Sequence, residues 1–344
     1  MIVGMLCIVP PHLLNEIASR GDELLKQWAL ATISLSESVR SRRQTFAFII
    51  PGIAKPAKKE RFVYDAEHDT SLPGKLVRRE GDNPTKDVAV NEAYDGAGWT
   101  YDLYQNIYSR NSIDDRGLRM DSTVHYSENY DNAFWNGDQM VYGDGDGRIF
   151  NRFTKAIDVI GHELTHGVTQ YTARLEYQGQ SGALNEHISD VFGSLVKQYS
   201  LSQTADTADW LIGQGLFTPS IHGEALRSMK APGTAYDDPL IGRDPQPAHM
   251  KDYVNTFEDN GGVHINSGIP NHAFYLAATA IGGNSWEKTG RIWYVTLFRL
   301  KSNSGFEEMA QHTFNVAGEL FGAGKTEQNA VKKAWAGVGI SIKK

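Results

Sequence analysis

Apolar residues recur three and four positions apart in two parts of the chain, near its start and throughout its second half. Near the start, the spacing of Leu, Ile and Ala in residues 13–38 predicts one or two amphipathic helices. In the second half, the same spacing predicts helices at residues 156–172, 182–199, 266–280, 290–300, 306–320 and 326–338. The second half is therefore expected to be a mainly helical lobe.

A different pattern fills residues 61–152, which are rich in Tyr, Asp, Asn and Gly. Short runs of β-forming residues, such as residues 122–126 and 139–142, are separated there by turn residues, which predicts a mostly β lobe. In the helical half, residues 220–247 are expected to form long surface loops. The predicted fold class is α+β, with a β-rich lobe, a helical lobe and a cleft between them.

The stretch at residues 51–59, PGIAKPAKK, follows a basic run that begins with Arg40, Arg42 and Arg43. Its two prolines and its charge disfavour a helix interior or a central strand, so we expect an exposed linker that proteases can reach. The linker divides the chain into a small N-terminal segment, a β-rich lobe and a helical lobe, at residues 1–54, 55–170 and 171–344.

Composition narrows the function classes. The formal net charge of −7 leaves no basic stripe for a nucleic-acid partner. The single cysteine, Cys7, rules out an intramolecular disulfide and leaves metal binding mainly to His and carboxylate side chains. Residues 1–9 are apolar but lack a basic start and end at Pro10-Pro11, which predicts no signal peptide and no membrane span. We expect a monomer, and the missing signal favours the cytoplasm.

The candidate chemistry begins at residues 160–166, which read Ile-Gly-His-Glu-Leu-Thr-His. On a helix, His162 and His166 lie one turn apart on the same face, so their imidazoles can hold a single ion, with Glu163 directed at a third position on it. Zinc suits imidazole and carboxylate ligands, and a catalytic zinc keeps one position open for water.

A third ligand is predicted at Glu186, twenty residues beyond His166 and near the start of another predicted helix. Asp190, one helical turn later, could accept the free N–H of a zinc-bound histidine. Bound zinc lowers the pKa of water and polarises a carbonyl, and Glu163 is placed to take the water proton and pass it to a leaving amine. Such a site hydrolyses amides.

These residues resemble the thermolysin-like metallopeptidases, and the resemblance runs from about residue 61 to the C-terminus. The matching stretches are YDAE at 64–67, NAFWNG at 132–137, MVYGDGDG at 140–147, RSM at 227–229 and NGGVHINSG at 260–268. The resemblance implies a two-lobe zinc endopeptidase that acts on proteins or peptides.

The resemblance also implies roles outside the zinc motif. His264 and Tyr177 would donate hydrogen bonds to the oxyanion of the tetrahedral intermediate, and Asp259 would orient His264. His187 follows Glu186 at a position where a small residue is more usual in the family. We interpret His187 as either a surface residue or a neighbour of the zinc site.

Substrate binding follows from the same resemblance. Asn132 and the backbone of Ala133 would bind the peptide main chain, and Arg227 would hold the carbonyl just past the scissile bond. Five apolar residues fall where the family builds the pocket for the residue after the cut: Phe150, Val159, Ile212, Leu216 and Leu226. The implied preference is cleavage before Leu, Phe, Ile or Val.

One part of the family pattern is missing. Asp158 and Asp209 match the paired-calcium site, but Lys197, Leu211 and Gln214 stand where acidic ligands are expected. Calcium needs hard oxygen ligands, and a lysine opposes them. We therefore expect no double calcium site, and a weaker calcium site elsewhere stays open.

The N-terminal segment, with Ile-Val-Pro-Pro-His-Leu-Leu at residues 8–14, resembles the short propeptides of the protealysin-like branch. Our hypothesis is that residues 1 to about 54 pack on the catalytic lobes and block the cleft until the linker is cut. Cys7 precedes this motif and could place a thiolate on the zinc. The alternative for Cys7 is a small buried hydrophobic residue.

Two other functions compete with a latent endopeptidase. Zinc aminopeptidases share the zinc motif, but they need acidic residues that clamp a free amine, and the sequence shows no such motif. An inactive precursor that acts as a binding protein is the other alternative, although it would not need Glu163 or His264. Members of the family are typically exported, so export by a non-standard route competes with the cytoplasm. The natural substrate and the activation cut stay open.

Overall fold

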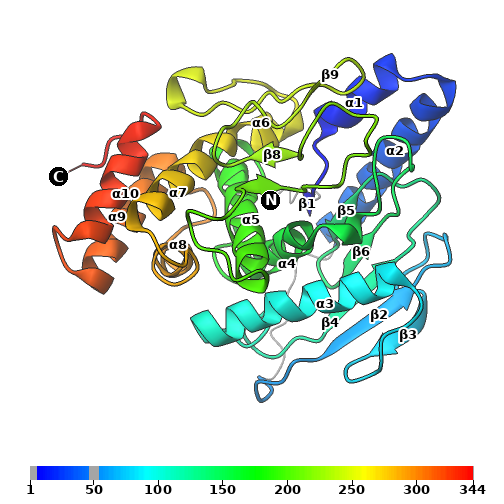
Figure 1. Cartoon of the computed structure of the whole chain (residues 1–344), viewed down its shortest axis with the longest axis horizontal. Helices are drawn as coiled ribbons and strands as arrows, with labels where there is room; N and C mark the ends of the chain where they lie inside the picture. The colour runs from blue at the N-terminus through cyan, green and yellow to red at the C-terminus, as the bar shows by residue number, and fades with distance from the viewer. Residues whose placement is uncertain (1–5, 46–53, 344) are drawn as a thin grey trace.

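The computed structural model describes residues 6–45 and 54–343, with the backbone alone for Leu6 and residues 39–45. It consists of a β-rich lobe, a helical lobe and a helical N-terminal segment that lies on one side of them (Figure 1). This arrangement confirms the predicted α+β fold class. The N-terminal segment contains β1 (Leu6–Cys7), α1 (Pro11–Arg20) and α2 (Glu23–Thr45).

A six-stranded sheet organises the β-rich lobe, with its strands in the order β1-β5-β6-β4-β2-β3. The strands β2, β4 and β6 are parallel, whereas β1, β5 and β3 run antiparallel to their neighbours. The strands that follow β1 are β2 (Arg61–Asp65), β3 (Lys75–Arg79), β4 (Met120–Val124), β5 (Ala133–Trp135) and β6 (Met140–Tyr142). Because β1 pairs with β5, the N-terminal segment supplies an edge strand of this sheet.

The β-rich lobe also contains a long helix that the sequence pattern did not predict. The helix α3 (Val88–Asp102) begins after Asp87, whose carboxylate accepts two backbone hydrogen bonds from the first turn, and it continues into a π-helical turn, Leu103–Ile107. Interior glycines weaken its helical signal. One of them, Gly96, is required by packing, because a Cβ there would clash with the side chain of Ile160.

All six predicted helices are present, with ends that differ from the prediction by at most three residues. A short helix, α6, was not predicted, and two small two-stranded ladders, β7 with β8 and β9 with β10, interrupt the loops that were predicted near residues 220–247. The helices are α4 (Ile157–Tyr171), α5 (Gly179–Ser200), α6 (Asp259–Asn266), α7 (Gly268–Ile281), α8 (Thr289–Leu297), α9 (Phe306–Phe321) and α10 (Thr326–Gly337). The ladder strands are β7 (Leu211–Ile212), β8 (Arg227–Ser228), β9 (Asp237–Asp238) and β10 (Gly242–Arg243), and 3-10 turns lie at Phe153–Lys155 and Met250–Asp252.

Two glycines let α4 and α5 approach each other closely. A Cβ built on Gly161 of α4 would lie 3.0 Å from the side chain of Val196, and one built on Gly193 of α5 would lie 3.0 Å from the backbone nitrogen of His162. A larger residue at either position would push the helices apart. The two helices lie against each other in the middle of the molecule (Figure 1), and His162 and His166 of α4 and Glu186 of α5 are all buried.

The N-terminal segment contacts both lobes. The His12 imidazole lies 3.0 Å from the Tyr236 hydroxyl in the helical lobe, and the backbone N–H of Asp131 in the β-rich lobe donates to the Thr32 hydroxyl at 3.2 Å. Leu13, Leu14 and Ile17 of α1 are buried against the rest of the chain. The segment is therefore docked and not merely tethered.

The predicted linker is described only in part. Residues 51–53 and the side chains of Arg40, Arg42 and Arg43 lie outside the described residues. Residues 54–58 form no helix or strand and are exposed, as expected of a linker. Within the described ranges, no helix is both long and apolar enough to cross a membrane.

Asp131, next to the contact with α2, is a buried carboxyl group. It is 0% exposed, and among the described residues neither of its carboxyl oxygens has a hydrogen-bond partner. Burial, together with the nearby Asp146 carboxylate, raises the pKa of Asp131 well above its usual range. Ionisation of Asp131 is unfavourable in the folded chain but not in the unfolded chain. The free energy of unfolding therefore falls as pH rises above about 4 toward the raised pKa.

We expect Asp131→Asn to stabilise the intact chain, because the amide cannot ionise and adds a donor near Asp146. Its melting temperature should rise by the equivalent of about 1–3 kcal/mol at pH 8 and by less at pH 5. Thermal unfolding at both pH values measures this. The control is Asp138→Asn at an exposed position of the same lobe. An equal gain at both pH values would contradict the ionisation argument.

Candidate active site

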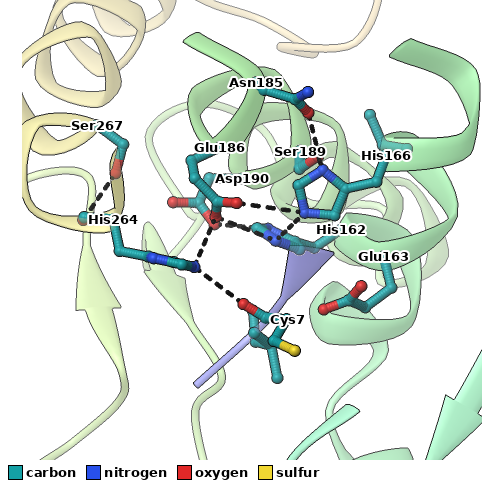
Figure 2. A network of polar contacts seen from close by, with 12 residues as sticks. Cys7, His162, Glu163, His166, Asn185, Glu186, Ser189, Asp190, His264 and Ser267 are labelled. Carbon is teal, nitrogen blue, oxygen red and sulfur yellow. Dashed lines mark hydrogen bonds and ion pairs between the residues drawn. The ribbon is translucent and has the colours of Figure 1, made fainter. Parts of the chain in front are cut away.

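The helix α4 places His162, Glu163 and His166 at the buried centre of the molecule, each 0% exposed. The two imidazole Nε2 atoms face each other at 3.0 Å, and ligand atoms of all three residues lie within 4.8 Å of one another. Figure 2 shows both rings directed toward the same point, with the Glu163 carboxylate beside it. The one-turn spacing predicted from sequence therefore does bring the two rings together.

Glu186, on α5, completes this group. Its Oε2 lies 3.5 Å from His162 Nε2, and its Oε1 lies 3.5 Å from His166 Nε2. Three ligands bound tetrahedrally at zinc distances would be about 3.3 Å apart. The Oε2 atom is buried without a hydrogen-bond partner among the described residues, which is costly unless a cation lies beside it. The residues present fit a zinc ion.

Glu163 differs from Glu186 in its surroundings. Its Oε2 accepts a hydrogen bond from the backbone N–H of Trp135 on β5, at 3.0 Å. Glu163 is therefore anchored to β5, whereas Glu186 faces both ring nitrogens. This contrast suits Glu186 as a metal ligand and Glu163 as a base.

Each metal-facing histidine is oriented through its other ring nitrogen. His162 Nδ1 lies 2.8 Å from Asp190 Oδ1, as predicted. His166 Nδ1 lies 2.9 Å from both Asn185 Oδ1 and Ser189 Oγ, which were not predicted. With a proton on each Nδ1, the Nε2 lone pairs are free for a metal. Asn185 and Ser189 lie next to Glu186 and one helical turn after it on α5. Their positions relative to Glu186 in the sequence could therefore have predicted that they contact the metal-facing histidines.

Asp190 links the metal-facing histidine to the substrate cleft. Arg227, on β8, donates Nε to Asp190 Oδ2 at 2.9 Å and a second N–H to Oδ1 at 2.8 Å. Burial opposes ionisation of Asp190, but the charge of Arg227 and the hydrogen bond with His162 lower its pKa below the usual range. Arg227 also donates to the backbone oxygen of Ile8 at 3.1 Å. The buried Asp190–Arg227 ion pair thus orients His162 and also contacts the N-terminal segment at Ile8.

His187 is 0% exposed, so its interpretation as a surface residue is wrong. Its Nε2 accepts a hydrogen bond from the Trp293 indole at 2.8 Å, and its Nδ1 donates to Asn271 Oδ1 at 2.8 Å. Asn271 in turn donates to Asp190 at 2.8 Å, so His187 neighbours the site through this amide. Burial lowers the pKa of His187 to about 4 and keeps the ring neutral.

The second predicted group of polar residues also converges. Asp259 accepts hydrogen bonds from the ring Nδ1 of His264 at 2.6 Å and from its backbone N–H at 2.8 Å. The Tyr177 hydroxyl contacts Glu186 and lies 3.2 Å from His264 Nε2. Burial alone would lower the pKa of His264, but the carboxylates of Asp259 and Glu186 raise it to about 9. His264 is therefore a charged donor at neutral pH.

The N-terminal segment lies within this cleft. The Cys7 carbonyl oxygen accepts a hydrogen bond from His264 Nε2 at 3.0 Å, and Figure 2 shows this oxygen turned toward His264 and the sulfur turned away. The Cys7 side chain is 2% exposed and packs in an apolar cluster. The cluster contains Tyr126, Tyr130, Phe134 and Val141. This placement favours the apolar alternative for Cys7 over a thiolate on the metal.

The next two residues of the segment meet the groups predicted to bind a peptide main chain. The backbone N–H of Ile8 donates to the Ala133 oxygen at 3.3 Å, and that of Val9 donates to Asn132 Oδ1 at 3.0 Å. Ile8 is 0% exposed and, like the five predicted pocket residues, is part of the main hydrophobic core of the molecule. Those residues are Phe150, Val159, Ile212, Leu216 and Leu226, each at most 1% exposed.

The predicted departure from the calcium pattern has a structural counterpart. The Lys197 ammonium lies 2.9 Å from both Asp158 and Asp209 and donates to the Leu211 carbonyl oxygen at 2.8 Å. Gln214 is exposed. A lysine charge therefore stands between the two acids that matched the paired-calcium site.

Family models cover almost the whole chain after the linker. Residues 54–170 match the model described as thermolysin metallopeptidase, catalytic domain. Residues 173–340 match the model described as thermolysin metallopeptidase, alpha-helical domain. The boundary between the models falls just after α4, where the structure passes from one lobe to the other.

Individual relatives extend the similarity to the N-terminal segment. An extracellular metalloprotease of Pectobacterium carotovorum subsp. carotovorum is 53% identical over 342 residues, covering 98% of this chain and 96% of that protein. A thermolysin of Alicyclobacillus acidocaldarius subsp. acidocaldarius is 44% identical over 290 residues, covering 81% of this chain and 50% of that protein. The solved precursor of protealysin, a metalloproteinase from Serratia proteamaculans, has a TM-score of 0.90 and 52% identity, covering 98% of this chain and 100% of that one.

We expect His187→Leu to lower the free energy of unfolding by about 1–3 kcal/mol, because it leaves the Trp293 and Asn271 groups unpaired. The free energy of unfolding of His187→Leu should also depend less on pH below about pH 6.5. A histidine whose folded pKa is lowered contributes stability above its ordinary pKa of about 6.5, and this is lost as pH falls toward 4. Denaturant unfolding from pH 7 to 4.5 measures both effects. The exposed His222→Leu is the control, and an unchanged pH slope in His187→Leu would refute the assignment.

Proposed function

This chain belongs to the thermolysin metallopeptidase family and is a metalloendopeptidase, and on that basis we propose that His162, His166 and Glu186 hold one zinc ion. The convergence of the two Nε2 atoms and the two Glu186 carboxylate oxygens, at 3.0 to 3.5 Å, carries this proposal. When bound, zinc polarises the scissile carbonyl and makes water more acidic. Asp190 keeps His162 in the tautomer that offers its Nε2 lone pair.

The protein groups around the metal have separate tasks in the proposed reaction. Glu163, anchored by the Trp135 N–H, takes a proton from the attacking water and delivers it to the leaving amine. His264 and Tyr177 donate hydrogen bonds to the oxygen that gains negative charge, and Asp259 holds His264 protonated and aligned. Each donor of this kind typically contributes a few kcal/mol to the transition state.

We propose that protein or peptide substrates bind as an extended strand along β5. The Ala133 carbonyl, the Asn132 amide and Arg227 hold the substrate backbone, since they hold the N-terminal segment in this way. The apolar pocket then selects a bulky apolar residue after the cut, such as Leu, Phe, Ile or Val. No motif for clamping a free amine accompanies these groups, and the family match gives no support to an aminopeptidase.

We propose that residues 1 to about 54 form a propeptide that keeps the enzyme latent, followed by catalytic lobes at 55–170 and 171–344. The support is direct: the segment occupies the main-chain binding groups and the His264 donor that a substrate needs. This also argues against a permanent binding protein, because Glu163 and His264 are in place. The naming of the Pectobacterium relative as extracellular supports action outside the cell, and we propose a monomer because one chain builds the whole cleft.

We propose that Lys197 takes the place of a divalent cation between Asp158 and Asp209. Calcium in the millimolar range should then leave the melting temperature of the zinc-loaded chain unchanged. Lys197→Glu should be destabilised without calcium, because it adds a third carboxylate to two, and should be restabilised by calcium. Thermal unfolding with calcium or a calcium chelator checks this, with the exposed Lys301→Glu as control. A calcium-dependent melting temperature in the wild type would contradict the proposal.

The function itself is tested by zinc content and by hydrolysis of a blocked peptide that contains Gly-Leu. We expect one zinc per chain, low activity in the intact chain, and higher activity once the chain is cut near residue 54. Glu163→Ala should retain zinc and lose activity by about 100-fold or more. A cut, zinc-loaded chain that trims free N-termini but leaves the blocked peptide intact would falsify the endopeptidase proposal.

A further inference from the structure

The N-terminal segment pairs with β5, the strand along which the proposed substrate would bind. It pairs antiparallel with β5, and Cys7 lies opposite Phe134. The next residue continues the ladder, because the backbone N–H of Ile8 donates to the Ala133 oxygen at 3.3 Å. A segment that blocked the site only by its bulk would not need these main-chain hydrogen bonds with β5.

The register fixes which peptide bond faces the proposed catalytic groups. The Cys7 carbonyl oxygen accepts a hydrogen bond from His264 Nε2 at 3.0 Å. On the other side, Trp135, which lies opposite Leu6 in the β1–β5 register, holds the Glu163 carboxylate through its backbone N–H at 3.0 Å. The following carbonyl, that of Ile8, is held by Arg227 at 3.1 Å. The bond between these two anchored carbonyls is Cys7–Ile8.

The side chains on both sides of this bond are buried in apolar surroundings. Ile8, after the bond, is 0% exposed and is one of the bulky apolar residues that the pocket is proposed to select. Cys7, before it, is small and packs among the aromatic rings of Tyr126, Tyr130 and Phe134. The segment therefore meets the demands of a substrate in direction, register and side chains.

We propose that this enzyme hydrolyses its own Cys7–Ile8 peptide bond within the intact chain; this rests on the proposed function. The oxygen of water bonds to the Cys7 carbonyl carbon, and the bond from that carbon to the Ile8 nitrogen breaks. Glu163 transfers the two protons of that water, one after the other, to the Ile8 nitrogen, which leaves as an ammonium group. The products are a Cys7 carboxylate, on a peptide of residues 1–7, and a new amino terminus at Ile8.

The leaving amine is held after the cut, which makes the net reaction slow. Arg227 still binds the Ile8 carbonyl, Asn132 still binds the Val9 N–H, and His12 still contacts Tyr236. An amine kept in place can re-form the bond, since proximity favours the reverse step as well. Only the departure of residues 1–7 completes the cleavage. The trimmed segment keeps α1 and α2, so this cut is distinct from the activating cut in the linker.

The test follows the mass of the zinc-loaded intact chain over time, with sequencing of new amino termini. We expect a product that begins at Ile8, with a half-life that is unchanged by tenfold dilution, and none in Glu163→Ala. Zinc-loaded Glu163→Ala gives a readout that does not depend on turnover: amide hydrogen exchange should be slow at Ile8 and Val9. Ile8→Asp, which puts a charge in the apolar pocket, should slow the cut at least tenfold. The exposed Asn15→Asp on α1 should not slow it.

The outcomes separate this inference from the proposed function. If the linker-cut chain hydrolyses the blocked peptide but no Ile8 terminus forms in the intact chain, the self-cleavage is refuted and the endopeptidase stands. The intramolecular step is overturned if the cleavage rate falls in proportion to dilution. It is also overturned if an active chain cuts added Glu163→Ala chain at the same rate. If neither the blocked peptide nor Cys7–Ile8 is cut by zinc-loaded protein, both proposals fail.

Discussion

The close crossing of α4 and α5 is the constraint on which the rest of the site depends. Because Gly161 and Gly193 carry no side chain, the two helices approach until His162 and His166 from one meet Glu186 from the other. Three polar groups in a dry centre cost free energy unless they are paired. A shared cation would remove that cost, so the helix packing and the proposed metal site are two aspects of one arrangement.

Asp190 connects His162 of this arrangement to Arg227. Its carboxylate accepts hydrogen bonds from a metal-facing histidine, from Arg227 and from Asn271, which saturates it at 0% exposure. A buried ion pair adds little net stability, but removal of either partner leaves a charge that nothing offsets. The pair therefore fixes geometry: the position of Arg227 in the cleft is tied to the orientation of His162.

Local patterns in the sequence predicted more of this molecule than long-range contacts did. The pairing of His162 with His166 follows from helical spacing, and amphipathic periodicity found every helix from α4 onward except α6, within a few residues of its ends. The helix α3 was missed because Gly96, which weakens its pattern, is required by packing on a distant helix. His187 could not be placed from sequence because Trp293 and Asn271, its partners, are about a hundred residues away in the chain. The orientation of the Cys7 side chain is set by the pairing of β1 with β5. A strand of two residues is too short for any sequence pattern to predict that pairing.

The short N-terminal segment can close the cleft because it is part of the same chain. Its contacts extend along the described part of the segment: backbone hydrogen bonds at Ile8 and Val9, the buried face of α1, and an ion pair between Asp22 and Arg148. While the linker is intact, the segment stays at a high effective concentration near the cleft, and this adds apparent affinity without any new contact. A cut in exposed residues 54–58 removes that advantage and leaves every contact unchanged. In the proposed mechanism, substrate then competes with a dissociable ligand for the same strand position on β5, so latency depends on the covalent connection as well as on the contacts.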